Sequence, residues 1–459
     1  MTSSTPPPPH VALFPSAGMG HLLPFLRLAA TLNSRGCHVT LITAEPTVSI
    51  SESSHISAFL RSNPKINHHS LHVQPLDSST DISDPFFKQF EAIRRSLHLV
   101  TPLLKSTSPP VTSIVTDITV SASMAEAVSE LDIPSYVLCT TSAKFFSLIC
   151  RLPVLISDPV NFEAEEIQIP GVAPIAKSSI PPPFSIPGHF FVKELLANAT
   201  SFPKFKGILI NSFTEFETQT LKALNDGKVM HGLPPVLPIG PLPAFDYPVK
   251  EVNEESQCRI LQWLDTQPNR SVIYLSFGSR TALPVDQITE IAKALEICSY
   301  RFVWILKLSK VDKEDREDLV DILGQTFLNN VKNRGIVIKE WVDQEKILSH
   351  SATGGFVSHC GWNSIMEAAE RGVPVVAWPL SGDQRVNAEV VVVDAGLGVW
   401  DRSWSGQRVV EAEEIVKKVA EVMDGGELIM RRAELVRVEA MRAVGDGGSS
   451  DANYVKAFF

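Results

Sequence analysis

Residues 10–43 of the chain read HVALFPSAGMGHLLPFLRLAATLNSRGCHVTLIT. Residues 10–15 are a short apolar run that predicts a buried strand, and residues 16–20 predict a glycine-containing loop. An amphipathic helix is predicted over residues 21–34, and a second strand over residues 38–43. Strand, loop, helix and strand in this order are typical of a parallel α/β unit with a right-handed crossover. A ligand of such a unit is expected at the loop that follows the first strand.

The alternation of strands and helices continues and then begins again in the second half of the chain. Apolar runs at residues 112–117, 135–139 and 207–211 predict further strands of the first sheet. The proline-rich residues 233–243 interrupt the pattern, because proline lacks a backbone donor and stiffens the chain. A second series of strands is predicted at residues 271–277, 301–306 and 335–339. Two such halves are expected to face each other across a ligand-binding cleft.

Length and composition agree with a globular protein of two domains. The 459 residues suffice for two domains of about 200 residues each, and 44% of them are hydrophobic. The net charge of -10 argues against nucleic-acid binding, so small-molecule partners are expected. The 6 cysteines form no Cys-x-x-Cys pair, which indicates reduced cytosolic thiols. The sequence shows neither a signal-peptide pattern nor an apolar run of about 20 residues, which predicts a cytoplasmic protein without a transmembrane segment.

Residues 354–379 (GGFVSHCGWNSIMEAAERGVPVVAWP) predict a strand, a turn, a short helix and another strand. A helix that begins near Asn363 directs its free backbone N–H groups, and the positive end of its dipole, at the turn. A diphosphate fits such a site, and His359, Asn363 and Ser364 add side-chain donors. Glu367 lies one turn further along the same helix face, where its carboxylate could accept hydrogen bonds from ribose hydroxyls.

Each of these residues also has a plainer interpretation, with Trp341 as a core aromatic, Asn363 and Ser364 as helix caps, and Glu367 as a surface acid. Taken together, they resemble the C-terminal signature of the plant family 1 UDP-glycosyltransferases, which spans 44 positions as residues 341–384 do here. The resemblance covers essentially the whole chain, including the early Gly-Met-Gly-His and the late Gly-Gly-Ser-Ser. It implies the GT-B fold, an α/β architecture of two Rossmann-like domains that face a central cleft. The domains expected are a disordered head (1–9), an acceptor-binding domain (10–238), a linker (239–252), a UDP-sugar-binding domain (253–435) and a C-terminal helix that returns to the first domain (436–459).

The resemblance also implies which residues bind a UDP-sugar. Trp341 would stack on uracil, Val342 would contact the base through its backbone, and Gln344 and Glu367 would lie at the ribose. The residues implied for the diphosphate are Ser279, Arg280, His359, Gly361, Asn363 and Ser364. Those implied for the sugar are Trp362, Asp383 and Gln384, and Gln384 favours glucose. The sequence departs from the family at residues 342–343, Val-Asp, where Ala or Cys followed by Pro is more common.

Sugar transfer needs an activated acceptor and a stabilised leaving diphosphate. His21 could act as a base, because an ordinary histidine pKa near 6.5 leaves the imidazole largely neutral at cytosolic pH, although by position alone His21 could equally be a helix-start residue. Asp117, at the end of a later strand, could orient the imidazole. The resemblance places the family's general base on His21 and its acidic partner on Asp117. It implies a single displacement with inversion that gives a β-glycoside. No Asp-x-Asp occurs in the sequence, so a reaction without metal or cofactor is expected.

Several motifs resemble the flavonoid C-glucosyltransferase branch of the family, including Asp84-Pro-Phe86 and Ile180-Pro-Pro-Pro-Phe184. They imply a polyphenol acceptor such as a 2-hydroxyflavanone or a dihydrochalcone, with a carbon–carbon bond to glucose, and O-transfer to a phenolic hydroxyl is the alternative. Candidate acceptor-pocket residues are Phe86, Thr141 and Phe184, and a monomer is expected. The proline-rich residues 170–190 predict either a plain surface loop or a loop that lines this pocket.

Two other classes of protein agree less well with the sequence. A dinucleotide-dependent oxidoreductase would need a third glycine where Leu23 stands after Gly18-Met-Gly20. A UDP-sugar binder without activity would not need His21 and Asp117 beside the donor-side residues.

Overall fold

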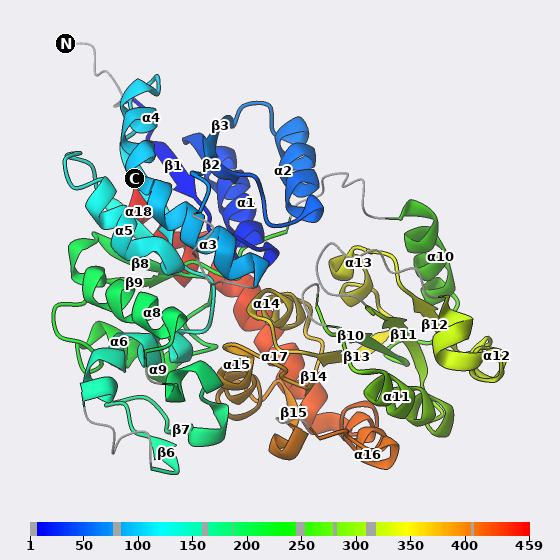
Figure 1. Cartoon of the computed structure of the whole chain (residues 1–459). Helices are drawn as coiled ribbons and strands as arrows, with labels where there is room; N and C mark the ends of the chain where they lie inside the picture. Colours follow the sequence, from blue (N-terminus) through cyan, green and yellow to red (C-terminus); the bar gives the residue numbers. More distant parts are fainter. Residues whose placement is uncertain are drawn as a thin grey trace.

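The computed structural model describes residues 7–76, 84–157, 164–186, 188–244, 253–278, 282–308, 318–404 and 408–459. They form two parallel β-sheets, each flanked by helices, which lie side by side in Figure 1. The first sheet has seven strands in the order β3-β2-β1-β4-β5-β8-β9. The second has six strands in the order β12-β11-β10-β13-β14-β15. In each sheet the order reverses direction beside the first strand, as it does in doubly wound folds.

The strands of the first sheet are β1 (His10–Phe14), β2 (His38–Glu45), β3 (Asn67–His72), β4 (Ser113–Asp117), β5 (Ser135–Cys139), β8 (Gly207–Ile210) and β9 (Val236–Pro238). The helices of this half are α1 (Met19–Ser34), α2 (Ile50–Ser62), α3 (Pro85–Ser96), α4 (Val100–Ser106), α5 (Ser121–Ala127), α6 (Ala143–Ser157), α8 (Phe190–Ser201) and α9 (Thr218–Asn225). A two-stranded antiparallel hairpin, β6 (Glu166–Ile167) with β7 (Ile175–Ala176), lies apart from the sheet.

The strands of the second sheet are β10 (Val272–Ser276), β11 (Arg301–Ile305), β12 (Gly335–Ile338), β13 (Thr353–Ser358), β14 (Val375–Ala377) and β15 (Gly398–Trp400). Its helices are α10 (Glu254–Asp265), α11 (Val285–Ile297), α12 (Leu319–Val331), α13 (Gln344–Leu348), α14 (Trp362–Arg371), α15 (Gln384–Glu389) and α16 (Ala412–Met423). The last two helices of the chain are α17 (Gly426–Val444) and α18 (Ser449–Phe458). Short 3-10 turns connect several of these elements.

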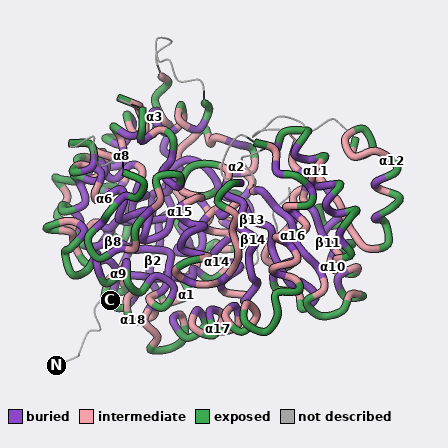
Figure 2. Tube along the Cα trace, turned by 90° about the horizontal axis from the view of Figure 1, so that it is seen from below, coloured by how far each residue is buried: buried purple, intermediate pink, exposed green. Residues whose placement is uncertain are grey.

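The central strands are buried along their whole length and consist mainly of apolar residues, because helices cover both faces of each sheet. Every residue of β1, β4, β10 and β13 is buried. Figure 2 shows buried residues concentrated in the interior of both halves, with exposed residues on the surrounding helices. The continuous apolar runs of the sequence therefore correspond to strands that have no solvent face.

The C-terminal segment runs from the second half of the molecule to the first (Figure 1). Helix α17 packs against α14, and α18 packs against β9. Arg35, which follows the last residue of α1, forms an ion pair with Asp451 of α18 at 2.6 Å, and Tyr136 donates a hydrogen bond to the Ala457 carbonyl at 2.7 Å. These contacts attach the end of the chain to the first sheet.

The carboxyl ends of the strands in both sheets carry the predicted site residues. Helix α1 begins at Met19, after Gly18, whose φ of 97° is a left-handed conformation that favours glycine. Asp117 is the last residue of β4, and His359 follows the last residue of β13. The two parallel sheets with helices on their faces agree with the fold class predicted from the sequence.

Candidate active site

A cleft of about 1510 Å³ lies between the two halves. Pro181 and Pro183 contribute to its wall, so the proline-rich loop lines the cleft rather than only covering the surface. The predicted site residues that line it are His21, Phe86, Thr141, Trp341, Val342, Gln344, His359, Gly361, Trp362, Asn363, Ser364, Glu367, Asp383 and Gln384. Asp117 is fully buried and does not line the cleft itself, but it contacts His21, which does. Ser279 and Arg280 lie outside the described residues.

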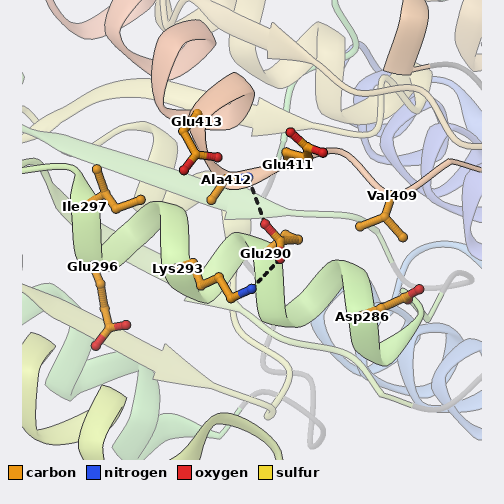
Figure 3. Close-up of a pocket in the computed structure, with 9 residues that line it drawn as sticks. All are labelled: Asp286, Glu290, Lys293, Glu296, Ile297, Val409, Glu411, Ala412 and Glu413. Atoms are coloured by element: carbon orange, nitrogen blue, oxygen red, sulfur yellow. Dashed lines mark hydrogen bonds and ion pairs between the residues drawn. The ribbon is translucent and has the colours of Figure 1, made fainter.

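A second hollow, of about 560 Å³, lies between α11 and the start of α16 (Figure 3). Its lining includes five carboxylates and one lysine, and Lys293 pairs with Glu290 at 2.6 Å. Carboxylates repel phosphate, so this hollow does not suit a nucleotide sugar.

His21 and Asp117 form a hydrogen-bonded pair at the cleft wall. His21 Nδ1 lies 2.8 Å from Asp117 Oδ2. The other carboxylate oxygen, Oδ1, accepts hydrogen bonds from the Thr119 backbone N–H at 2.9 Å and from its hydroxyl at 2.5 Å. Since Asp117 accepts at Nδ1, that nitrogen carries the hydrogen and Nε2 carries the lone pair. The pair therefore has the geometry of a base and its orienting acid.

The N-terminus of α14 forms the opposite wall. Gly361 caps this helix and contributes no side-chain hydrogen bond to it. Asn363 and Ser364 lie in its first turn and line the cleft, and the Asn363 amide donates to the Gly20 carbonyl at 3.3 Å. Backbone N–H groups at such a helix start are suited to bind a diphosphate.

His359 lies between two glycines at this helix start. A Cβ on Gly278 would lie 2.5 Å from Nε2 of His359, and one on Gly361 would collide with the same atom. The ring lines the cleft but is largely withdrawn from solvent, and this desolvation lowers the pKa of His359 to about 4. His359 is therefore neutral at pH 7, and any hydrogen bond it gives to phosphate comes from an uncharged ring.

The residues implied for uracil and ribose lie next to one another. Trp341 is half-buried, with its ring 5.9 Å from that of His55 across the cleft. The Gln344 amide donates to Ser364 Oγ at 2.9 Å and to Glu367 Oε2 at 2.8 Å. Glu367 itself is buried, which makes its plainer interpretation as a surface acid wrong.

The departure from the family at residues 342–343 has a local explanation. Val342 is buried in the core of the second half. The Asp343 side chain caps α13 by accepting from the backbone N–H groups of Glu345 and Lys346. Its own backbone N–H donates to Gln257 at 2.7 Å, a hydrogen bond that proline could not make.

The three residues implied for the sugar differ in what their polar groups contact. Asp383 accepts hydrogen bonds from Thr141 and from Asn387, the latter at 2.9 Å. The Gln384 side-chain oxygen accepts from the backbone of the preceding turn. Trp362 lines the cleft, but its indole N–H donates to the Asn211 carbonyl at 2.7 Å and is therefore already engaged.

The first half of the molecule contributes an apolar wall. Phe86 lines the cleft and its ring stacks with that of His21, with 6.1 Å between centroids. Phe184 is not a lining residue, because it lies behind Phe145 at 6.3 Å between centroids. In this half, sequence reasoning missed four phenylalanines that line the cleft, although the runs 86–90 and 190–191 are a visible signal for three of them. These residues are Phe87, Phe90, Phe145 and Phe191.

Two further findings concern the described residues alone. No group of three or more His, Cys, Asp or Glu side chains in this part of the chain is arranged to hold a metal ion. None of the helices resolved there has the length and apolar character needed to cross a membrane.

Known proteins share this sequence and architecture. A family model for UDP-glucoronosyl and UDP-glucosyl transferases matches residues 246–435. The chain is 46% identical over 455 residues to UDP-glycosyltransferase 708G2 of Citrus unshiu, with 97% of this chain and 95% of the relative covered. It is 43% identical over 449 residues to UDP-glycosyltransferase CGT of Oryza sativa subsp. japonica, with 96% and 94% covered. The chain belongs to the plant family 1 UDP-glycosyltransferases.

Solved structures extend the similarity to the whole glycosyltransferase. The crystal structure of LpCGTa in complex with UDP is 41% identical, covers 98% of each chain and has a TM-score of 0.86. The structure of Medicago truncatula UGT71G1 complexed with UDP-glucose is 28% identical, covers 98% of each chain and has a TM-score of 0.85. The glycosyltransferase therefore has the GT-B fold.

The desolvated His359 gives the glycosyltransferase a predicted dependence of stability on pH. Its pKa is about 4 when folded and 6.5 when unfolded, so the unfolded chain takes up a proton below pH 6.5 that the folded protein does not. This stability is present above pH 6.5 and is lost as the pH falls toward 4. Between pH 7.5 and pH 5.0 the free energy of unfolding should fall by about 2 kcal/mol more in the wild type than in His359→Asn. Urea unfolding at both pH values measures the difference, and equal losses would contradict it.

Proposed function

We propose that this glycosyltransferase transfers glucose from UDP-glucose to a ring carbon of a polyphenol, with inversion at the anomeric carbon. The observation that carries the proposal is the His21–Asp117 pair, which lies between an aromatic wall and the N-terminus of α14. The aromatic wall suits a flat phenolic ring. The helix N-terminus suits the diphosphate of the donor.

In the proposed reaction, His21 Nε2 takes the proton of a phenol hydroxyl and Asp117 stabilises the imidazolium that forms. The ring carbon ortho to the phenolate attacks the anomeric carbon of glucose from the face opposite the diphosphate. A carbon–carbon bond forms while the bond to the diphosphate oxygen breaks, and UDP leaves. Loss of the proton on the attacked carbon to solvent restores the aromatic ring. The imidazolium of His21 then returns its proton to the phenolate oxygen, so the products are a phenolic β-C-glucoside, UDP and the one proton released from the ring carbon.

The donor side of the proposal is supported by solved neighbours that hold UDP or UDP-glucose. The carbon–carbon bond is supported by the motifs Asp84-Pro-Phe86 and Ile180-Pro-Pro-Pro-Phe184, which resemble those of flavonoid C-glucosyltransferases. Two similar proteins, the rice CGT and LpCGTa, carry the letters CGT in their names. O-transfer to a phenolic hydroxyl is the second candidate, because the same base would activate the oxygen. The charge of the leaving diphosphate would be met by α14 and its neighbours, so we propose that no metal is required.

The proposal is tested by incubating the protein with UDP-glucose and a dihydrochalcone and then heating the product in acid. A glucoside that survives acid is expected, because a carbon–carbon bond is not hydrolysed as an acetal is. Parallel reactions with and without EDTA should proceed at equal rates. A product that releases glucose in acid would replace C-transfer by O-transfer, and no product with any phenol would overturn the polyphenol acceptor.

A further inference from the structure

Arg27 joins the two halves of the molecule at the donor site. It lies on α1, the helix that carries His21, and only 9% of its surface is exposed. Its guanidinium Nη2 lies 2.6 Å from Oε1 of Glu367 on α14 and 3.7 Å from Oε2 of Glu345. Burial lowers the pKa of Arg27, but these two carboxylates raise it further, so the pKa lies above its usual range. Arg27 is therefore a buried charge that is paired across the cleft.

Glu367 is held on both of its carboxylate oxygens. Arg27 binds Oε1, and the Gln344 amide donates to Oε2 at 2.8 Å. Gln344 is held in turn by the Tyr274 hydroxyl, which donates to its side-chain oxygen at 3.3 Å. Each carboxylate oxygen has two lone-pair sites, so each keeps one that a ribose hydroxyl can use. These contacts set the orientation in which the carboxylate meets a donor.

The same two helices meet again at their N-terminal ends. There the Asn363 amide of α14 donates to the Gly20 carbonyl, next to His21 on α1. Arg27 lies between one and two turns further along α1 than His21. The ribose end and the phosphate end of the donor site are therefore both attached to the helix that carries the base.

We propose that Arg27 is a positioning residue that orients the Glu367 carboxylate toward the 2′- and 3′-hydroxyls of the donor ribose. Arg27 thereby sets the preference of the enzyme for ribonucleotide sugars over 2′-deoxyribonucleotide sugars. The inference rests on the proposed function in that it takes the donor to be UDP-glucose bound with its ribose at Glu367. A guanidinium is suited to this role, because its planar set of N–H donors can hold a carboxylate in a defined orientation.

The test compares UDP-glucose with 2′-deoxy-UDP-glucose in the wild type and in Arg27→Met. Methionine fills a similar volume but cannot hold the carboxylate. We expect the ratio of kcat/KM values for the two donors to fall about tenfold, mainly through a higher KM for UDP-glucose. The KM for the deoxy donor should rise less, because only its 3′-hydroxyl can bind the Glu367 carboxylate. A merely structural role would weaken both donors equally.

Arg35→Met is the matched control. Arg35 follows the last residue of the same helix and pairs with Asp451 at 2.6 Å, and it does not line the cleft, so its variant should keep the wild-type ratio. If Arg27→Met does not fold, Arg27→Gln keeps a donor beside Glu367 and should lower the ratio about threefold. A folded Arg27 variant with the wild-type ratio would overturn this inference and leave the proposed function unaffected. A wild-type enzyme that used neither donor would instead overturn the proposed function.

Discussion

Replacing His21 by alanine should lower kcat about a thousandfold with UDP-glucose and a polyphenol, while the Kd for UDP stays at its wild-type value. General base catalysis raises a reaction rate about 10²- to 10⁴-fold. Among the described residues, His21 is the imidazole that both lines the cleft and binds Asp117. His21 lies on α1 in the first half of the molecule, so its loss should leave in place the residues of α14 that we propose to bind the diphosphate. The amount of product formed at fixed reaction times gives kcat, and calorimetric titration with UDP gives the Kd.

Asp117 provides a second test of the same pair. Asp117→Asn keeps the side-chain shape but can present an amide N–H to Nδ1, which favours the tautomer with its hydrogen on Nε2. Since the two residues act as a unit, His21→Ala with Asp117→Asn should lose about as much as His21→Ala alone. Full turnover by His21→Ala with normal UDP binding would remove His21 from the role of base. Multiplicative losses would show that the residues act independently.

Replacing Gly361 by alanine should weaken UDP binding about a hundredfold, which corresponds to about 2.7 kcal/mol. The backbone at Gly361 has φ of -60°, so alanine causes no backbone strain there. Its methyl group would instead collide with the ring of His359. The ring must then move toward the position that the diphosphate would occupy. Calorimetric titration of the variant with UDP measures the effect.

The collision with His359 can be separated from a general disturbance of α14. In a His359→Ala background the ring is absent, so adding Gly361→Ala should weaken UDP binding by less than threefold. The double-mutant cycle thus reports the contact between the two residues. Wild-type affinity in Gly361→Ala alone would show that the site tolerates the methyl group and would contradict the description of a tightly packed imidazole.

Local signals in the sequence predicted the elements well. The helix expected near Asn363 begins at Trp362, and the helix expected from residue 21 begins at Met19. Both starts follow a glycine whose neighbours form a loop, and such information is contained within a few residues. The buried strands were equally visible, because strands covered on both faces are rich in apolar residues along most of their length.

The contacts between distant elements could not be predicted in this way. In the sequence, Arg27 is one polar position of an amphipathic helix. Only the packing of α1 on α14 brings it to Glu367, which is 340 positions away along the chain. Buried Lys144 likewise pairs with Asp394 across the two halves at 3.3 Å. Phe184 was expected to line the cleft because of its motif, but it is buried against Phe145, which lines the cleft in its place. These long-range contacts depend on how whole helices pack against one another, and the hydrophobic periodicity of the sequence does not encode that packing.

Two-dimensional NMR of the purified product from UDP-glucose and a dihydrochalcone tests the central claim most directly. We expect a β-configured glucose whose anomeric proton shows a long-range correlation to a ring carbon without an oxygen substituent. An anomeric carbon attached through oxygen would contradict transfer to carbon. An α-configured sugar would contradict a single displacement assisted by His21.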